Sequence, residues 1–470
     1  MPRSHPRSTE RAAALPFWLL VAFLLILFVA GGASRADVLG QPVVRFFAWS
    51  ILIAFVLFAR QFRWPPKAPA IILGAAALLV LVQLIPLPPS WWMSLPGRDI
   101  IAQAAIITDQ PQPWRPLSMS PGATANALGS LIVPAVALLL VAQLSREQQW
   151  RILGWVLALV VAGSLLALLQ FSGGGFDNLF VNDPAGAVSG TFANRNHMAL
   201  FLAVGCLVSP AWAFRGEKIQ LWRMLLGIGL LPFLLLIILA TGSRAGLALG
   251  ALGTLLGLFI SWQSIRRELK ALPRKLRLPL LGGFAAAVAG ILVLSFTLGR
   301  AEAVERVLTL ESAEDLRARA LPVVLQMIGQ YMPAGSGFGT FDPVYRISEP
   351  DTLLQPAYFN HAHNDWLEVL LDGGAAGTLL LLAAVGWWLY ASIRAWRTKS
   401  ARNLPRLASA VILLVFLASI VDYPARTPMI MALLAISGAW LASNGSATKL
   451  KERGGTGSRS FTTASPPTIA

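Results

Sequence analysis

The sequence predicts an all-α polytopic membrane protein with about twelve transmembrane helices, and composition and hydropathy are the reasons. Of the 470 residues, 56% are hydrophobic and only 13% are charged, with a mean hydropathy of +0.64, whereas a soluble domain carries about 25% charged residues. A helix that crosses a bilayer needs about 20 apolar residues, and about twelve continuous blocks of that length occur. Such blocks exclude an outer-membrane barrel, whose strands are short and alternating.

The apolar blocks define the predicted spans and divide the chain into three regions. The spans lie near residues 15–33, 42–59, 69–85, 124–144, 152–170, 196–214, 224–240, 245–262, 278–297, 374–393, 405–421 and 428–443. Residues 1–14 form a predicted cytoplasmic segment, residues 15–443 the transmembrane domain, and residues 444–470, rich in Gly, Ser and Thr, a disordered cytoplasmic tail. The single cysteine, Cys206, lies inside a span, which excludes an intramolecular disulfide and a cysteine-based metal site.

The first span has an alternative interpretation. Ser34-Arg35-Ala36 resembles a small-residue cleavage site, so residues 1–36 are compatible with a signal peptide that is removed. The apolar stretch is long enough to remain as an anchor, and we therefore expect it to be retained.

The positive charges follow the membrane topology. With the N-terminus in the cytoplasm, 26 of the 38 lysines and arginines fall in cytoplasmic segments, and the short loop 263–277 alone holds six. This distribution obeys the positive-inside rule. The net charge of +16 is therefore a topology signal, and we expect no nucleic-acid partner.

Three outward segments are longer than simple connections, namely 86–123, 171–195 and 298–373. In the longest, Ser312 and Asp315 resemble the start of a helix. Apolar residues then follow at helical spacing up to Tyr331. This large periplasmic loop is therefore predicted to carry an amphipathic helix, kinked at Pro322.

Polar chemistry is concentrated at the outer ends of the spans. Ionisable residues at mid-depth are scarce and no internal repeat is visible, which argues against an ion-coupled transporter. Positive charge is disfavoured on the outer side, so each outward arginine contacts lipid headgroups or binds an anion. Arg244 favours the second role, because it follows Thr241-Gly242-Ser243 directly before a helix, where backbone N–H groups and a guanidinium suit a phosphate.

Three of the four histidines, His197, His361 and His363, are also outward. Two histidines beside Asp365 suggest zinc, but residues two apart share a face only on a strand. A catalytic or substrate-binding histidine is favoured over a metal ligand and over histidines bonded only to backbone. No pair of outward acids indicates a glycosidase.

Several motifs, taken in order, resemble the bacterial O-antigen ligase and O-antigen polymerase superfamily. The matching segments are Ser189–His197, Thr241–Gly246, Arg317 with Pro333–Gly339, His363-Asn364 followed after nine residues by Gly374 and Gly377, and Asp422–Pro428. The resemblance is dense over 187–378. Leu321 stands where the family usually has a tryptophan four residues after the loop arginine, so Arg319 competes with Arg317 for that role.

The resemblance implies a glycosyltransferase C-like membrane enzyme of the bacterial inner membrane. Such enzymes transfer a glycan from an undecaprenyl-pyrophosphate carrier to an acceptor sugar hydroxyl at the periplasmic face, with no metal and no cofactor. It implies catalytic roles for His363, Arg244 and Arg317. It implies substrate-binding roles for Arg319, Arg195, Asn196, His197, Asn364 and Arg426.

These residue types suit that reaction, because a pyrophosphate leaving group needs positive charge and the attacking hydroxyl needs a base. The histidine motif favours an O-antigen ligase of lipopolysaccharide biosynthesis, with lipid A core as acceptor. A polymerase that joins carrier-linked repeats is the main alternative. A lipid-linked glycan flippase and a noncatalytic scaffold are weaker ones. Membrane lipids and envelope-polysaccharide assembly proteins are the expected further partners.

Overall fold

The chain is an all-α polytopic membrane protein. The computed structural model describes residues 6–174, 178–181, 187–216, 220–271, 313–354, 359–398 and 403–443, with scattered residues between 273 and 293. Seven helices in this part are long and apolar enough to cross a membrane. They are α2 (Gly40–Phe58), α6 (Pro121–Ser130) continued by α7 (Ile132–Gln143), α8 (Arg146–Phe171), α9 (Arg195–Ala213), α10 (Leu221–Ala240), α11 (Arg244–Ala271) and α15 (Asp365–Arg397).

Four shorter apolar segments complete the bundle: Ala14–Ala30 of α1 (Pro6–Ala30), α3 (Lys67–Val82), α16 (Asn403–Ala418) and α17 (Pro428–Ala442). Every predicted span except 278–297 coincides with one of these helices, and 278–297 falls largely outside the described residues. The total of twelve spans stays a prediction.

Helix α9 is the most deeply buried of the seven long helices, and nearly every side chain from His197 to Ala213 is buried. Helix α11 packs closely on it. A Cβ at Gly253 or Gly257 would lie 2.6 or 2.5 Å from a carbonyl oxygen of α9. Small residues allow this approach, as is common between membrane helices.

Helix α1 is part of the same core. Phe17, Leu20, Phe23 and Leu27 are buried, and the helix packs against α2, α7 and α8. Removal of residues 1–36 would expose this surface. The retention of this segment as an anchor stays a prediction.

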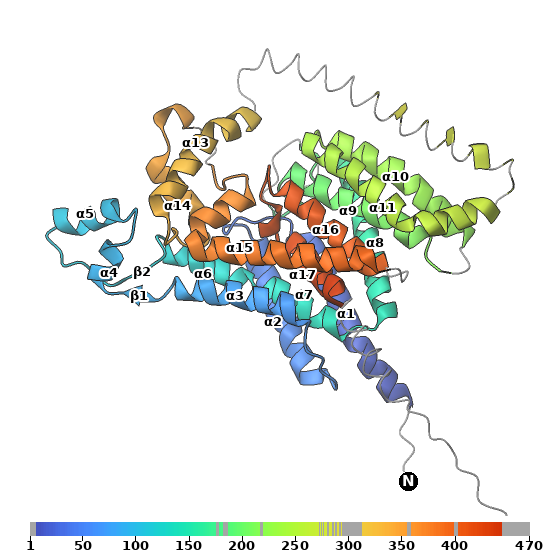
Figure 1. Ribbon diagram of the computed structural model, residues 1–470, viewed down its shortest axis with the longest axis horizontal. Coiled ribbons are helices and arrows are strands. Elements are labelled where there is room, and N and C mark those ends of the chain that lie inside the picture. The colour runs from blue at the N-terminus through green and yellow to red at the C-terminus, as the bar shows by residue number, and fades with distance from the viewer. Residues whose placement is uncertain are drawn as a thin grey trace, which may run out of the picture.

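One end of the bundle carries the extramembrane elements. Figure 1 shows α4 (Pro89–Met93), α5 (Asp99–Ile107), α13 (Ala313–Tyr331) and α14 (Phe341–Ser348) on its left, beyond the ends of α3 and α15. Strands β1 (Pro86–Leu87) and β2 (Arg115–Pro116) pair antiparallel at the base of the arm that carries α4 and α5. We refer to this end as the loop end.

Helix α13 is the amphipathic helix predicted from the sequence. Its buried residues Ala320, Val324, Met327 and Tyr331 form a second core with Phe341 and Tyr345 of α14, and Pro322 lies within the helix. The proposed first residue of its cap, Ser312, lies outside the described residues.

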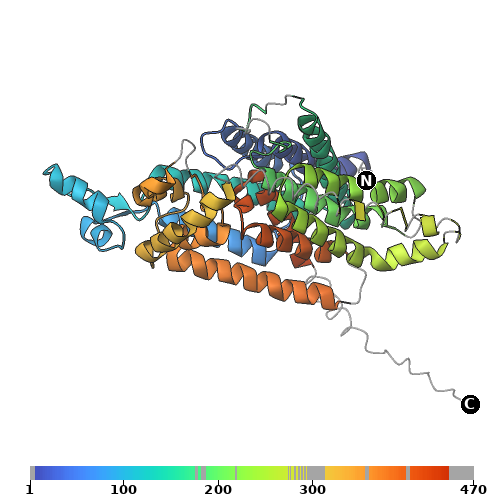
Figure 2. The ribbon, with the colours of Figure 1, turned by 90° about the horizontal axis from the view of Figure 1, so that it is seen from above.

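Helix α15 begins inside the predicted outward segment 298–373. It starts at Asp365 and bends at Gly374, where φ is +55° and where the predicted span begins. The extent of the outward segment stays a prediction. A Cβ at Gly374 would lie 2.3 Å from the carbonyl oxygen of Pro333, and one at Gly335 would lie 2.6 Å from the backbone N of Gly374. The bend therefore interlocks with the glycine-rich turn after α13. Figure 2 shows the long part of α15 along one edge of the bundle.

Candidate active site

Asp422 is the centre of the candidate site. It follows α16, precedes the short helix η2 (Pro424–Arg426), and is buried, with 2% of its surface exposed. Its Oδ2 accepts hydrogen bonds from the side-chain amides of Asn194, at 3.0 Å, and Asn196, at 2.6 Å. Its Oδ1 accepts from the Tyr423 backbone N–H at 3.0 Å and lies 3.2 Å from His363 Nδ1. A carboxylate with this many donors is held in its ionised form.

His197 and Arg317 complete this group. His197 Nε2 lies 3.7 Å from Asp422 Oδ1, and Arg317 Nη2 lies 3.8 Å from Asp422 Oδ2. Arg317 Nη1 also donates to the carbonyl oxygen of Val421 at 3.4 Å. The start of α9, the loop before α15, the start of α13 and the segment after α16 thus meet at one carboxylate.

The pKa values of Asp422 and His363 are both lowered, which suits an ionised carboxylate that orients a neutral base. Burial alone would raise the pKa of Asp422, but His197 and His363 outweigh it and hold this pKa well below its ordinary value. Burial lowers the pKa of His363. The Asp422 hydrogen bond and charge oppose that shift, while the charges of Arg317 and His361 add to it. The imidazole of His363 is therefore neutral near pH 7.

Arg195 and Arg244 lie beside this group. The turn before α11 is closed by Ser243, whose Oγ accepts the Gly246 N–H at 2.9 Å, and Arg195 Nη1 would lie 3.3 Å from a Cβ at Gly242. Ala245 and Gly246 line one small pocket together with Asn196, His197 and Asp422. Both arginines are exposed, so two positive charges face solvent next to the first turn of α11.

Arg319 and Asn364 occupy other positions. Arg319 is exposed and its Nη2 donates to the Thr352 carbonyl oxygen at 2.9 Å, away from Asp422. The Asn364 side chain caps α15 by accepting the Leu367 N–H at 3.0 Å, and its Nδ2 donates to the Ile420 carbonyl oxygen at 2.8 Å. Asn364 thus ties the His363 loop to the segment that carries Asp422.

Arg426 belongs to a second polar cluster. Its guanidinium lies 3.3 Å from Asp365, 3.2 Å from Glu368 and 3.6 Å from Asp372. Burial would lower the pKa of Arg426, but these three carboxylates raise it above its ordinary value. The guanidinium to which the resemblance assigned a substrate-binding role is therefore ion-paired with three carboxylates of the protein itself.

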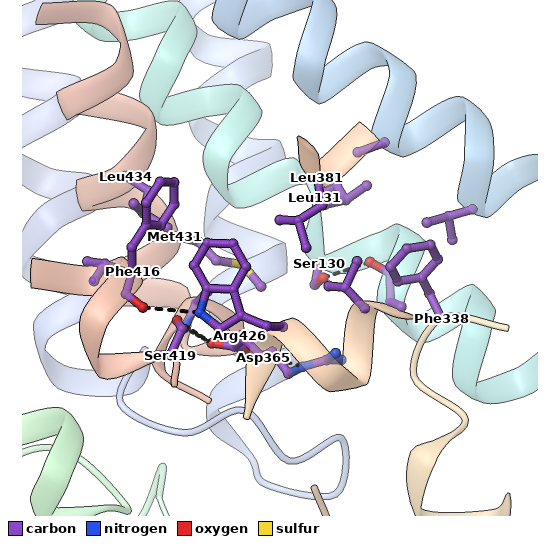
Figure 3. A pocket seen from close by; sticks show the side chains of 17 residues that line it. Ser130, Leu131, Phe338, Asp365, Leu381, Phe416, Ser419, Arg426, Met431 and Leu434 are labelled. Carbon is purple, nitrogen blue, oxygen red and sulfur yellow. Dashed lines mark hydrogen bonds and ion pairs between the residues drawn. The ribbon is translucent and has the colours of Figure 1, made fainter. Parts of the chain in front are cut away.

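A cavity of about 300 Å³ adjoins this cluster (Figure 3). Arg426, Asp365 and Ser419 lie at one side of it, and Ser419 Oγ donates to Asp365 at 2.8 Å. The rest of the lining is mainly apolar and comes mostly from α3, α6, α15, α16 and α17.

The two histidines before α15 face different carboxylates. His361 Nδ1 lies 2.9 Å from Glu368 Oε1, whereas His363 Nδ1 faces Asp422. Both rings pack on Tyr423, with ring centroids 4.2 and 4.8 Å away. Within the described part of the chain, no group of three or more His, Cys, Asp or Glu side chains is arranged to hold a metal ion.

Sequence analysis missed the acidic partners of these groups. Asp422 entered only within the matching segment Asp422–Pro428 and Asp365 only as a neighbour of two histidines, and Glu368 and Asp372 were assigned no role. Their signal in the sequence was weak but present: each adjoins an apolar segment, and a carboxylate buried there requires a partner.

The fold and the site define a class of protein: a polytopic helical membrane protein with a histidine, a buried carboxylate and several arginines gathered at its loop end. Residues 228–382 match the family model described as O-antigen ligase. The match supports the O-antigen ligase-like superfamily and confirms the resemblance found in the motifs. That superfamily consists of glycosyltransferase-like enzymes with lipid-linked glycan substrates. No curated protein matches the sequence.

The matched range includes Arg244, Arg317, Arg319, His363 and Asn364. It begins after Arg195–His197 and ends before Asp422. The contacts that join Asp422 to His363 and Arg317 therefore bring in residues from outside the matched range.

Proposed function

We propose that this protein is an O-antigen ligase that transfers a glycan from an undecaprenyl-pyrophosphate carrier to a hydroxyl of lipid A core, at the periplasmic face of the bacterial inner membrane. The observation that carries the proposal is the pairing of His363 with buried Asp422, with Arg317 against the same carboxylate. Together they provide a base and a positive charge in one place.

His363 is the base in this proposal. A carboxylate only accepts hydrogen bonds, so the His363 nitrogen that faces Asp422, Nδ1, carries the proton and Nε2 carries the lone pair. Nε2 takes the proton of the acceptor hydroxyl as its oxygen attacks the anomeric carbon. Asp422 fixes this tautomer and stabilises the imidazolium that forms, as a buried aspartate does in a catalytic triad.

The arginines serve the leaving group. Pyrophosphate leaves as a stable anion and needs no general acid. Negative charge nevertheless develops on the oxygen that joins it to the anomeric carbon as that bond breaks. Arg317, with Arg195 and Arg244 beside the first turn of α11, supplies positive charge there. The proposal involves no metal ion and no cofactor.

Deletion of the gene in its native host tests this function. A polysaccharide gel and an extraction of carrier-linked glycan are read side by side. Bare lipid A core together with accumulated carrier-linked polymer is the result expected for a ligase. Core capped with a single repeat would instead identify a polymerase, and unchanged display with no accumulation would contradict both.

A further inference from the structure

A second histidine–carboxylate pair lies next to the proposed site and ends on a serine. Ser34 follows α1 and is half-buried. Its Oγ lies 3.3 Å from His361 Nε2, and His361 Nδ1 lies 2.9 Å from Glu368 Oε1. Ser34 comes from the segment after α1, whereas His361 and Glu368 lie seven residues apart around the start of α15. The order of the three groups is hydroxyl, imidazole, carboxylate.

The hydrogen bonds of this group run in one direction. Glu368 is fully buried, accepts the Ala362 backbone N–H at 2.9 Å, and lies 3.2 Å from Arg426 Nη1, so it is an ionised acceptor. In the neutral form of His361, Nδ1 therefore donates to Glu368 and Nε2 carries the lone pair. The Ser34 hydroxyl consequently donates to Nε2, which is the arrangement that activates a serine nucleophile.

The neighbouring site determines which electrophile this serine meets. His361 and His363 pack against the same ring, Tyr423, so Ser34 and the proposed base border one small region. Substitution at an anomeric carbon forms no tetrahedral oxyanion, so it needs no oxyanion hole, and pyrophosphate leaves as a stable anion. A carrier-linked glycan bound at the Asp422 site would thus present its anomeric carbon to either hydroxyl.

We propose that Ser34 is an internal acceptor of the carrier-linked glycan, so that the protein glycosylates itself at this residue. The Ser34 Oγ–C1 bond forms as the bond between C1 and the pyrophosphate oxygen breaks. The hydroxyl proton passes to His361 Nε2, and the polyprenyl pyrophosphate leaves with the bonding electron pair. Glu368 is a positioning residue that fixes the His361 tautomer. This inference rests on the proposed function, because the donor is the same.

Mass spectrometry of the full-length protein tests the inference. The protein is purified in detergent from cells that make the carrier-linked glycan and from matched cells that lack it. We expect the peptide that contains Ser34 to carry the glycan mass only in the first case. Ser34→Ala should lose the adduct and Ser34→Thr should keep it. His361→Gln should lower the rate at which the adduct forms by roughly 10²–10⁴-fold, the usual contribution of a general base, as followed over time after the donor is supplied.

Two results would overturn the inference. One is the absence of glycan on Ser34 in wild-type protein from donor-making cells. The other is an adduct that forms at the same rate in His361→Gln as in the wild type. The wild-type measurement decides the matter even if a variant fails to fold. His363→Ala separates the two proposals, because it should abolish transfer to the external acceptor and leave the Ser34 adduct in place. If carrier-linked glycan accumulates on gene deletion but Ser34 is unmodified in the wild type, the inference is contradicted and the proposed function is not.

Discussion

At the residue scale, His363 is held in an unusual backbone conformation. Its φ is +49°, in the left-handed region that residues other than glycine rarely occupy. The surroundings hold it there, because Asp422 contacts its side chain and the next residue, Asn364, donates a hydrogen bond to the Ile420 carbonyl oxygen. Such strain concentrates at functional sites, and here it directs the imidazole toward the carboxylate.

The protonation of His363 leads to a prediction about pH. Burial and the charges of Arg317 and His361 lower its pKa below the ordinary value, so the base form persists to mildly acidic pH. We expect the transfer rate to fall on the acidic side with a midpoint below about pH 6.5, the ordinary pKa of an imidazole, because the base form is lost only as pH drops through the lowered pKa. A pH–rate profile in membranes measures this.

A matched variant checks the physical cause of that shift. Arg317→Gln removes a positive charge near the imidazole, so the pKa of His363 should rise and the acidic limb should move to higher pH. An acidic limb that stays in place in this variant would mean that His363 is not the titrating base.

The two arginines near the start of α13 are expected to differ in effect. Arg317 lies 3.8 Å from Asp422, whereas Arg319 donates to the Thr352 carbonyl oxygen. Arg317→Ala should lower the transfer rate by roughly 10²–10³-fold, the usual effect of losing one preorganised donor. Arg319→Ala should remain close to wild type. Equal losses in the two variants, assayed at equal protein level, would contradict the assignment.

At the scale of elements, the bend at Gly374 supports the site. Gly374→Ala forces a Cβ to within 2.3 Å of the Pro333 carbonyl oxygen at a φ of +55°. We expect a loss of at least about 1–3 kcal/mol, the range for a residue in a forbidden backbone region. Thermal unfolding in detergent measures it.

Gly386 provides the matched control on the same helix. A Cβ at Gly386 meets nothing within 4 Å, so Gly386→Ala should leave the unfolding temperature unchanged or slightly higher. Equal melting of the two variants would show that the bend does not depend on glycine.

The helices were predictable from the sequence, whereas the pairing of the site was not. Apolar length alone located the spans, and helical spacing located α13, because both signals are local. The contact between His363 and Asp422 joins residues 59 apart, and that between Ser34 and His361 joins residues 327 apart. No local pattern encodes such contacts. Arg426 shows the consequence, since its three carboxylate partners appear only in the folded chain.

At the scale of the whole molecule, the distribution of arginine and lysine predicts which end of the bundle is periplasmic. Gln330 is exposed on α13 at the loop end. Gln61, between α2 and α3, is exposed in a predicted cytoplasmic loop. In a Cys206→Ala background, Gln330→Cys should react with an impermeant maleimide in cells with a permeabilised outer membrane, and Gln61→Cys should not. The reverse pattern would invert the topology and place the site in the cytoplasm.

The central claim is that His363, oriented by Asp422, is the base of a glycan transfer. It is tested most directly by complementing a deletion strain with wild-type protein and with His363→Ala at equal membrane levels. The account predicts that His363→Ala accumulates carrier-linked glycan and leaves the acceptor bare, while the wild type restores display. Full display with His363→Ala would contradict it.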